Sequence, residues 1–244
     1  MEQLTEGNAA KLYCLNWIAR YAADKTEVSI LDLGSGRSGN FVKLLQQFPQ
    51  VRYVGIEPSP ADCDHARHAT AGLNATIING YAYDVQGRLV QEQFDLVTSF
   101  SVFEHVYRRV EYIKSIKSCL KPGGTCLINY DAGHFMSPAS LRERVKNVVG
   151  PLLARMGRER YFQAFVPEAD FQSMLSQVGL KVLEAKSFNT HLKGVYRHIP
   201  QPDRAEYMQR WLDMELWLNE RGIVYDDPKA RTWLTRNFLL EHAT

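Results

Sequence analysis

The sequence predicts an α/β protein built on a doubly wound, mostly parallel β-sheet. Short β-rich runs alternate with helical segments through the first half of the chain, beginning with VSILDLG and RYVGIEP. This alternation is typical of βαβ units, whose right-handed crossovers give a parallel sheet covered by helices on both faces. The 244 residues, of which 45% are hydrophobic, are enough for one such domain with a modest addition.

Seven runs have the composition of strands and predict a seven-stranded sheet. Five lie in the first half, namely VSILDLG, RYVGIEP, ATIINGY, FDLVTSF and GTCLINY, and KVLEAKSF and KGVYRHI follow later. Helices are expected between the strands, and apolar spacing predicts another helix over residues 9–21. A helical insert is expected at about residues 136–165. A helix over residues 168–177 should end at Gly179.

The C-terminal part of the chain is expected to be helical. After Pro200, residues 205–220 and 229–241 have helical spacing and carry several tryptophans. We therefore expect the main domain at residues 1–200 and a C-terminal helical extension at residues 201–244. So many large apolar groups must pack on the body, on a partner subunit or over the pocket, and a homodimer could form through these helices.

The net charge and the cysteine content limit which binding partners and which cell compartment are expected. The net charge is only +2, which argues against nucleic acid and against an acidic membrane surface. The four cysteines show neither a CxxC pair nor a zinc-like spacing with histidine, so we expect no metal and reduced thiols in the cytoplasm. Neither a transmembrane run nor a signal peptide is expected.

The strongest motif is ILDLGSGRSGN, at residues 30–40, between a β-rich run and a helical run. Gly34 and Gly36 permit a tight turn and a close backbone approach to a ligand, and the helix start beyond them suits an anionic group. Glu57 ends the next strand, where an acid can accept both hydroxyls of a ribose. The pattern indicates a cofactor that contains a nucleoside.

Four stretches, ILDLGSG, VGIEPS, FDLVTSFSVFEHV and LKPGG, together resemble the class I S-adenosylmethionine-dependent methyltransferases. The resemblance covers residues 28–130 and extends loosely to Arg197. It implies a Rossmann-like sheet with an antiparallel last strand, S-adenosyl-L-methionine as cofactor, and methyl transfer to an acceptor.

The same resemblance assigns cofactor-binding residues. Asp32, Gly34 and Gly36 would hold the methionine half, Glu57 would bind the ribose, and Phe100 would lie near the adenine or the transfer site. The remaining residues expected at the cofactor are Ser35, Pro58, Tyr81, Ala82 and Asp84.

The sequence departs from the family pattern in two places. Ser38 stands where a third glycine is usual, and a serine there is expected to cap the following helix. After the third strand the family usually has Gly-Asp, whose acid holds the adenine amine. This chain has Gly80-Tyr81-Ala82-Tyr83-Asp84, so either Tyr81 replaces that contact or Asp84 supplies it.

Methyl transfer from a sulfonium needs alignment and a dry site, and a hydroxyl acceptor also benefits from a general base. His134, in the loop after the fifth strand, is the first candidate, and the further ones are Glu104, His105, Asp131 and His191. Glu104 and His105 resemble an EH pair of the branch that includes ubiquinone-pathway O-methyltransferases, where the pair is structural or metal-binding. Adjacent helical residues point in different directions, so a metal would need ligands from elsewhere.

The insert gives the clue to the acceptor. Its basic residues are Arg142, Arg144, Lys146, Arg155, Arg158 and Arg160, against only Glu143 and Glu159. In the family this insert often covers the acceptor pocket, and arginine suits carboxylates and phosphates. A solvated helix face is the alternative. We expect a small-molecule acceptor with an apolar or aromatic body and an anionic group, methylated on a hydroxyl or carboxylate oxygen.

Other functions stay open. They are N- or C-methylation of a metabolite, methylation of protein or nucleic acid, and cofactor binding without catalysis. An adenine-N6 enzyme would show N/D-P-P-Y/F after the fourth strand, where this chain has SFSV. A nicotinamide oxidoreductase is disfavoured by the missing third glycine and by FEHV and LKPGG.

Overall fold

The computed structural model describes residues 8–85, 92–131, 141–159, 162–189, 193–223 and 234–243. One seven-stranded sheet with the order β3-β2-β1-β4-β5-β7-β6 organises the chain. The strands are β1 (Val28–Leu33), β2 (Val51–Glu57), β3 (Ala75–Asn79), β4 (Phe94–Phe100), β5 (Leu120–Asp131), β6 (Leu180–Asn189) and β7 (Leu234–His242). β1 to β5 pair in parallel, whereas β7 is antiparallel to both β5 and β6. This topology confirms the predicted fold class.

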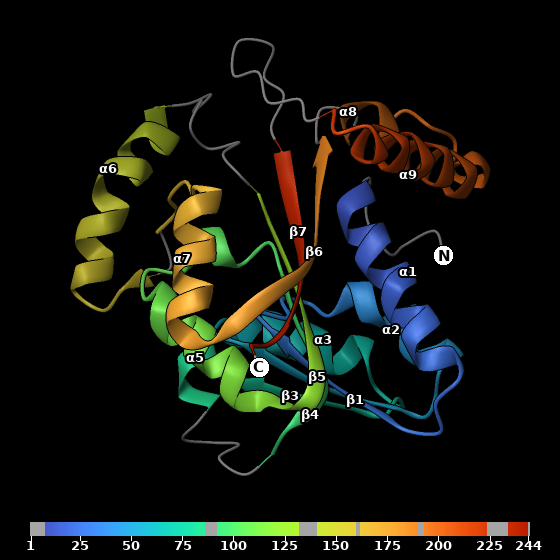
Figure 1. Cartoon of the computed structure of the whole chain (residues 1–244), viewed down its shortest axis with the longest axis horizontal. Helices are drawn as coiled ribbons and strands as arrows, with labels where there is room; N and C mark the ends of the chain where they lie inside the picture. The colour runs from blue at the N-terminus through green and yellow to red at the C-terminus, as the bar shows by residue number, and fades with distance from the viewer. Residues whose placement is uncertain are drawn as a thin grey trace.

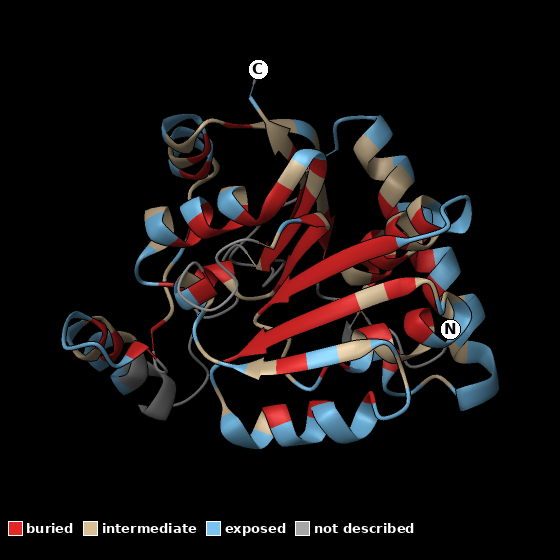
Figure 2. Ribbon diagram, turned by 90° about the horizontal axis from the view of Figure 1, so that it is seen from below, coloured by how far each residue is buried: buried red, intermediate tan, exposed pale blue. Residues whose placement is uncertain are grey.

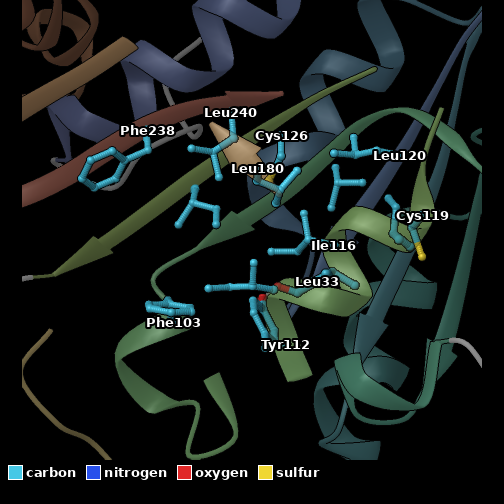
Figure 3. Close-up of a cluster of buried hydrophobic side chains, with 14 of the residues drawn as sticks. Leu33, Phe103, Tyr112, Ile116, Cys119, Leu120, Cys126, Leu180, Phe238 and Leu240 are labelled. Carbon is cyan, nitrogen blue, oxygen red and sulfur yellow. Dashed lines mark hydrogen bonds between the residues drawn. The ribbon is translucent and has the colours of Figure 1, made fainter. Parts of the chain in front are cut away.

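Helices cover both faces of the sheet (Figure 1). α1 (Ala9–Ala23), α2 (Gly39–Gln47) and α3 (Pro60–Ala69) share one apolar cluster with the strands. α5 (Arg109–Cys119) and α7 (Glu168–Val178) belong to the cluster on the other face, part of which is drawn in Figure 3. All six residues of β1 are buried, as expected for a parallel strand covered on both sides. Figure 2 shows the same layering, with buried strands inside and exposed outer helix faces.

Two predicted elements near the C-terminus are wrong. Residues 229–241 were expected to form a helix, but Leu234–His242 is β7, inserted between β5 and β6. The run KGVYRHI is not a strand, since it begins with the short helix α8 (Lys193–Tyr196). Periodicity does not distinguish a strand from a helix in a short apolar run. Here the position between β5 and β6 in the sheet selects the strand. A boundary after residue 200 would therefore divide the strands of one sheet.

The predicted helix over residues 205–220 is confirmed as α9 (Arg204–Glu220). It packs against α1 (Figure 1) through a small apolar cluster that includes Leu12 and Trp211. Glu215 lies in this contact with 1% of its surface exposed, and it accepts hydrogen bonds from Trp211 Nε1 at 2.9 Å and from the Asn189 backbone N–H at 3.0 Å. The bond from Asn189 holds α9 to the end of β6, whereas the bond from Trp211 lies within α9 and orients the carboxylate.

The insert contains α6 (Leu141–Arg155), which lies at the periphery of the molecule (Figure 1). Two short 3₁₀ helices, η1 (Ala82–Asp84) and η2 (Phe103–His105), follow β3 and β4. α7 ends at Gly179 with φ +80°, as predicted. No helix in the described ranges has both the length and the apolar character needed to cross a membrane.

Candidate active site

A cavity of about 580 Å³ lies beyond the carboxyl ends of β1, β2 and β4. Ligands of open α/β sheets bind at this edge, and the volume is in the usual range for small-molecule sites. The expected site residues in its wall are Gly34, Glu57, Pro58, Tyr81, Ala82 and His105. The structure does not place Asp32, Ser35, Gly36, Asp84, Phe100 or Asp131 in that wall.

The turn after β1 is held against the end of β2. The backbone N–H groups of Gly34 and Ser35 both donate to the Ile56 carbonyl, at 2.8 and 3.0 Å. Gly34 has φ +79°, and a Cβ atom there would lie 2.5 Å from a methyl group of Val102. Both the backbone conformation and the close approach therefore require glycine at this position.

The Glu57 carboxylate is oriented by the backbone around it. One oxygen accepts from the Gly36 N–H at 2.9 Å and the other from the Ser59 N–H at 2.8 Å. Burial raises the pKa of Glu57, and these two backbone donors oppose that rise. Each carboxylate oxygen has a second lone pair, so the group can still accept hydroxyl donors from the cavity that it lines.

Asp32 lies behind the glycine turn and joins three strands. Its oxygens accept from the Thr98 hydroxyl and from the Tyr53 hydroxyl, each at 2.8 Å. Only 4% of the residue is exposed, and burial raises the pKa of Asp32 to about 6. The carboxyl therefore braces β1 against β2 and β4 beneath the loop.

Ser38 does not cap α2 through its side chain, so that prediction is wrong. The residue takes the left-handed conformation with φ +55°. Its hydroxyl lies 3.1 Å from the Tyr53 hydroxyl. Because Tyr53 donates its one proton to Asp32, Ser38 is the donor in this bond. The loop thus uses Ser38 to extend the hydrogen bonds around Asp32.

Tyr81 and Asp84 lie in the segment that follows β3, and they have different contacts. Asp84 accepts from the Tyr81 N–H at 3.4 Å and caps η1. Tyr81 is in the cavity wall, and its ring stacks on Tyr83 with a centroid distance of 5.8 Å.

The EH pair after β4 points in two directions. Glu104 is buried, and its carboxylate accepts from the Asp131 N–H at 3.3 Å, next to the end of β5. His105 lines the cavity, with its Nδ1 atom 3.1 Å from the Phe162 carbonyl. Glu104 thus belongs to the support of the site, and His105 belongs to its wall.

The chain matches a known family over residues 7–185, and that family is described as the methyltransferase domain. The match covers well over half of the protein. The chain belongs to the class I S-adenosylmethionine-dependent methyltransferases. S-adenosylmethionine is its cofactor, and when bound it supplies a methyl group activated on a sulfonium. The turn at Gly34 and the Glu57 carboxylate, both at the cavity, fit this cofactor.

Solved structures support the fold of this methyltransferase. A candidate sarcosine dimethylglycine methyltransferase from Galdieria sulphuraria has a TM-score of 0.61 at 18% identity, over 96% of this chain and 86% of that one. The O-methyltransferase of a Brevibacillus brevis trans-AT PKS multienzyme, in complex with S-adenosyl-L-homocysteine, gives 0.56 at 15%, over 94% and 72%.

A third structure carries a different chemistry on a similar fold. It is a phosphoethanolamine N-methyltransferase 2 of Haemonchus contortus, with a TM-score of 0.59 at 18% identity, over 96% of this chain and 53% of that one. O- and N-methyltransferases therefore share this architecture, and likeness of fold leaves the acceptor atom open.

The insert of the methyltransferase reaches the cavity through Glu159. Its carboxylate accepts from the Tyr83 hydroxyl and from Arg108 Nε at 3.3 Å. The Arg108 guanidinium also lies over the Tyr83 ring, 3.9 Å from the centroid. This cluster joins the insert to η1 and to the segment after η2.

Sequence reasoning missed Glu159 as a wall residue because its partners are 76 and 51 positions away. The other wall residues that it missed are Ser59, Pro60, Asp62, Tyr83, Ser101, Val102, Val106 and Tyr112. Ser59 and Val106 lie within the motifs EPS and FEHV themselves, and Pro60, Asp62, Ser101 and Val102 lie within three positions of them. Ser101, with φ +58°, is one of these neighbours.

Several predicted residues of the methyltransferase lie outside the described residues. They include His134 and His191, Arg160, and the side chains of Arg142, Arg144 and Lys146. Arg155 and Arg158 are described and exposed, and neither belongs to the cavity wall.

Proposed function

We propose that this methyltransferase methylates an oxygen of a small-molecule acceptor that has an apolar or aromatic body and an anionic group. The observation that carries the proposal is the single cavity wall shared by the cofactor motif, at Gly34 and Glu57, by His105 and by Glu159 of the insert. A wall of this kind brings a cofactor site, a titratable group and an acceptor-covering segment together.

On the cofactor side, each residue has a distinct task. Glu57 binds the ribose hydroxyls, because its orientation is preset by two backbone donors. Tyr81 and Ala82 contact the adenine, since Asp84 is already engaged in capping η1. Asp32 acts as a positioning residue for the glycine turn rather than as a direct ligand.

His105 is the described residue best suited to act as general base. A carbonyl oxygen can only accept, so the contact with Phe162 puts the ring proton on Nδ1. The basic lone pair of the neutral ring is then on Nε2, where it can take the proton from an acceptor hydroxyl. His134 remains the other candidate from the sequence.

The proposal is tested first at the cofactor. We expect S-adenosylhomocysteine to bind the purified protein in isothermal titration. Glu57→Ala should weaken binding by about 1.5–3 kcal/mol, because it removes a charged acceptor. Asp64→Ala, which changes an exposed acid on α3, serves as the matched control and should bind like wild type. Equal affinity of wild type and Glu57→Ala would place the ribose elsewhere.

The acceptor is tested with labelled cofactor and a set of hydroxyl, carboxylate and amine compounds. Transfer to oxygen supports the proposal, whereas transfer to amines alone refutes it. Once an acceptor is known, His105→Gln and His134→Ala are compared. The variant that lacks the base should turn over ~10²-fold more slowly while its cofactor affinity stays normal.

The anionic group of the acceptor is tested at the basic insert. We expect Arg155→Gln, Arg158→Gln or Arg160→Gln to raise the KM for the acceptor in at least one case. If all three variants keep wild-type kinetics, these basic residues form only a solvated helix face and do not bind the acceptor.

A further inference from the structure

Helix α6 faces the protein with its small residues and the solvent with its large apolar ones. Gly150 is buried, and only 4% of Ala154 is exposed. Asn147, one turn earlier, accepts a hydrogen bond from the Gln163 side chain at 2.6 Å. A helix that packs on a core through its apolar face shows the opposite arrangement.

Five apolar side chains form what we call the α6 stripe. Their exposed fractions are 53% for Val145, 70% for Val148, 38% for Val149, 58% for Leu152 and 76% for Met156. Counted from Val145, the next three lie three, four and seven positions on, so these four share one side of α6, and Met156 follows in the turn directly after the helix. A contiguous exposed patch of this kind marks an interaction surface.

Basic positions border the α6 stripe on both sides. At about 100° per residue, positions 142 and 146 fall beside one edge, and positions 144 and 155 beside the other. All four are Arg or Lys, and Glu143 is the one acid of the helix. Arg155 is exposed, as is Arg158 just beyond the helix. An apolar side between two cationic borders is the pattern of helices that lie in the surface of an anionic bilayer.

We propose that the α6 stripe docks on the surface of an anionic phospholipid bilayer, with the helix lying parallel to it. A second copy of the chain fits less well. Two stripes packed face to face would bring cationic borders from both copies together, whereas lipid phosphates would neutralise them. The whole-chain charge of +2 does not reveal this local charge, because it averages the basic insert with acids elsewhere.

The docked helix would lie close to the active site. Met156, the last residue of the stripe, is three positions before Glu159, which lines the cavity. Docking would therefore bring the insert side of the cavity near the lipid headgroups. The proposal does not depend on which acceptor is methylated.

The test is sedimentation of the full-length protein with vesicles of phosphatidylglycerol and phosphatidylcholine, and with phosphatidylcholine vesicles alone. We expect binding to the anionic vesicles that weakens as salt is added. The double variant Val148→Ser with Leu152→Ser should bind at least about tenfold more weakly. Leu183→Ser, at a β6 residue that is 50% exposed, is the matched control and should bind like wild type.

Cofactor titration and thermal unfolding check that the variants stay folded, which is expected for exposed positions. The proposal is overturned if wild type does not bind the anionic vesicles, or if the double variant binds as well as wild type. It is also overturned if light scattering without lipid shows a dimer that the double variant abolishes, since the stripe would then be a subunit interface.

Discussion

The two sides of the cavity are held together by different kinds of contact. On the cofactor side, backbone N–H groups of the glycine turn donate to the Ile56 carbonyl and to the Glu57 carboxylate. On the insert side, Glu159 is held mainly by the side chains of Tyr83 and Arg108. The bonds to the Ile56 carbonyl join main-chain groups and do not depend on which side chains surround them, and Glu57 supplies the one side-chain acceptor among these bonds. The cofactor side is therefore built into the fold, whereas the insert side can change without disturbing it.

The largest effect is expected at the glycine turn. Gly34→Ala places a methyl group 2.5 Å from Val102 at a residue with φ +79°, so both overlap and backbone strain oppose it. We expect S-adenosylhomocysteine to bind about 100-fold more weakly in titration.

Gly36→Ala is the matched control for this change. It has φ +53° but nothing within 4 Å of the added methyl group, so only backbone strain remains. A loss of about tenfold is expected, within the 1–2 kcal/mol typical of such strain. If both variants lose the same affinity, the contact with Val102 does not shape the site.

The next largest effect is a pH dependence of the unfolding free energy, which arises from Asp32 beneath the turn. The folded pKa of Asp32 is about 6, above its unfolded value, because burial penalises the charged form. Its contribution to stability is therefore complete below about pH 4 and is lost as the pH rises through 6. Asp32→Asn removes this contribution. The difference in unfolding free energy between wild type and variant should change by up to about 3 kcal/mol between pH 4 and 7 in urea titrations. If this difference stays constant with pH, burial does not raise the pKa of Asp32 in the folded protein.

A smaller effect is expected on the insert side. Glu159→Gln keeps an acceptor for the Tyr83 hydroxyl but removes the charge that faces Arg108, whose side chain is 52% exposed. Because solvent screens that ion pair, we expect a loss of about 1 kcal/mol or less. The KM for the acceptor should rise a few-fold, while cofactor affinity stays within about twofold of wild type. A variant that loses the cofactor instead would show that the two sides are not independent.

The smallest effect is expected for the stability of the insert surface. Arg155 is exposed, so Arg155→Gln should change the unfolding free energy by no more than about 0.5 kcal/mol. Chemical denaturation measures this directly. A larger loss would reveal a structural contact for this arginine.

The sequence located residues of the cavity wall best where their position depends on local chain geometry. ILDLGSG and the acid of VGIEPS locate Gly34 and Glu57, because a strand, a glycine turn and the next strand are close in sequence as well as in space. Glu104 and His105 were found together, yet their opposite directions, one toward β5 and one toward the cavity, became visible only in the fold.

The sequence by itself determined the alternation of strands and helices, the glycine turn and the family to which the chain belongs, since each depends on neighbouring residues. Only the tertiary structure decided the position of β7, the hydrogen-bond partners of Asp32 and the place of Glu159. β7 pairs with strands that are distant in sequence, and Asp32 turns toward two hydroxyls from other strands. These outcomes depend on which surfaces meet after the chain has folded, because an apolar run or a carboxyl group is compatible with several partners until packing selects one.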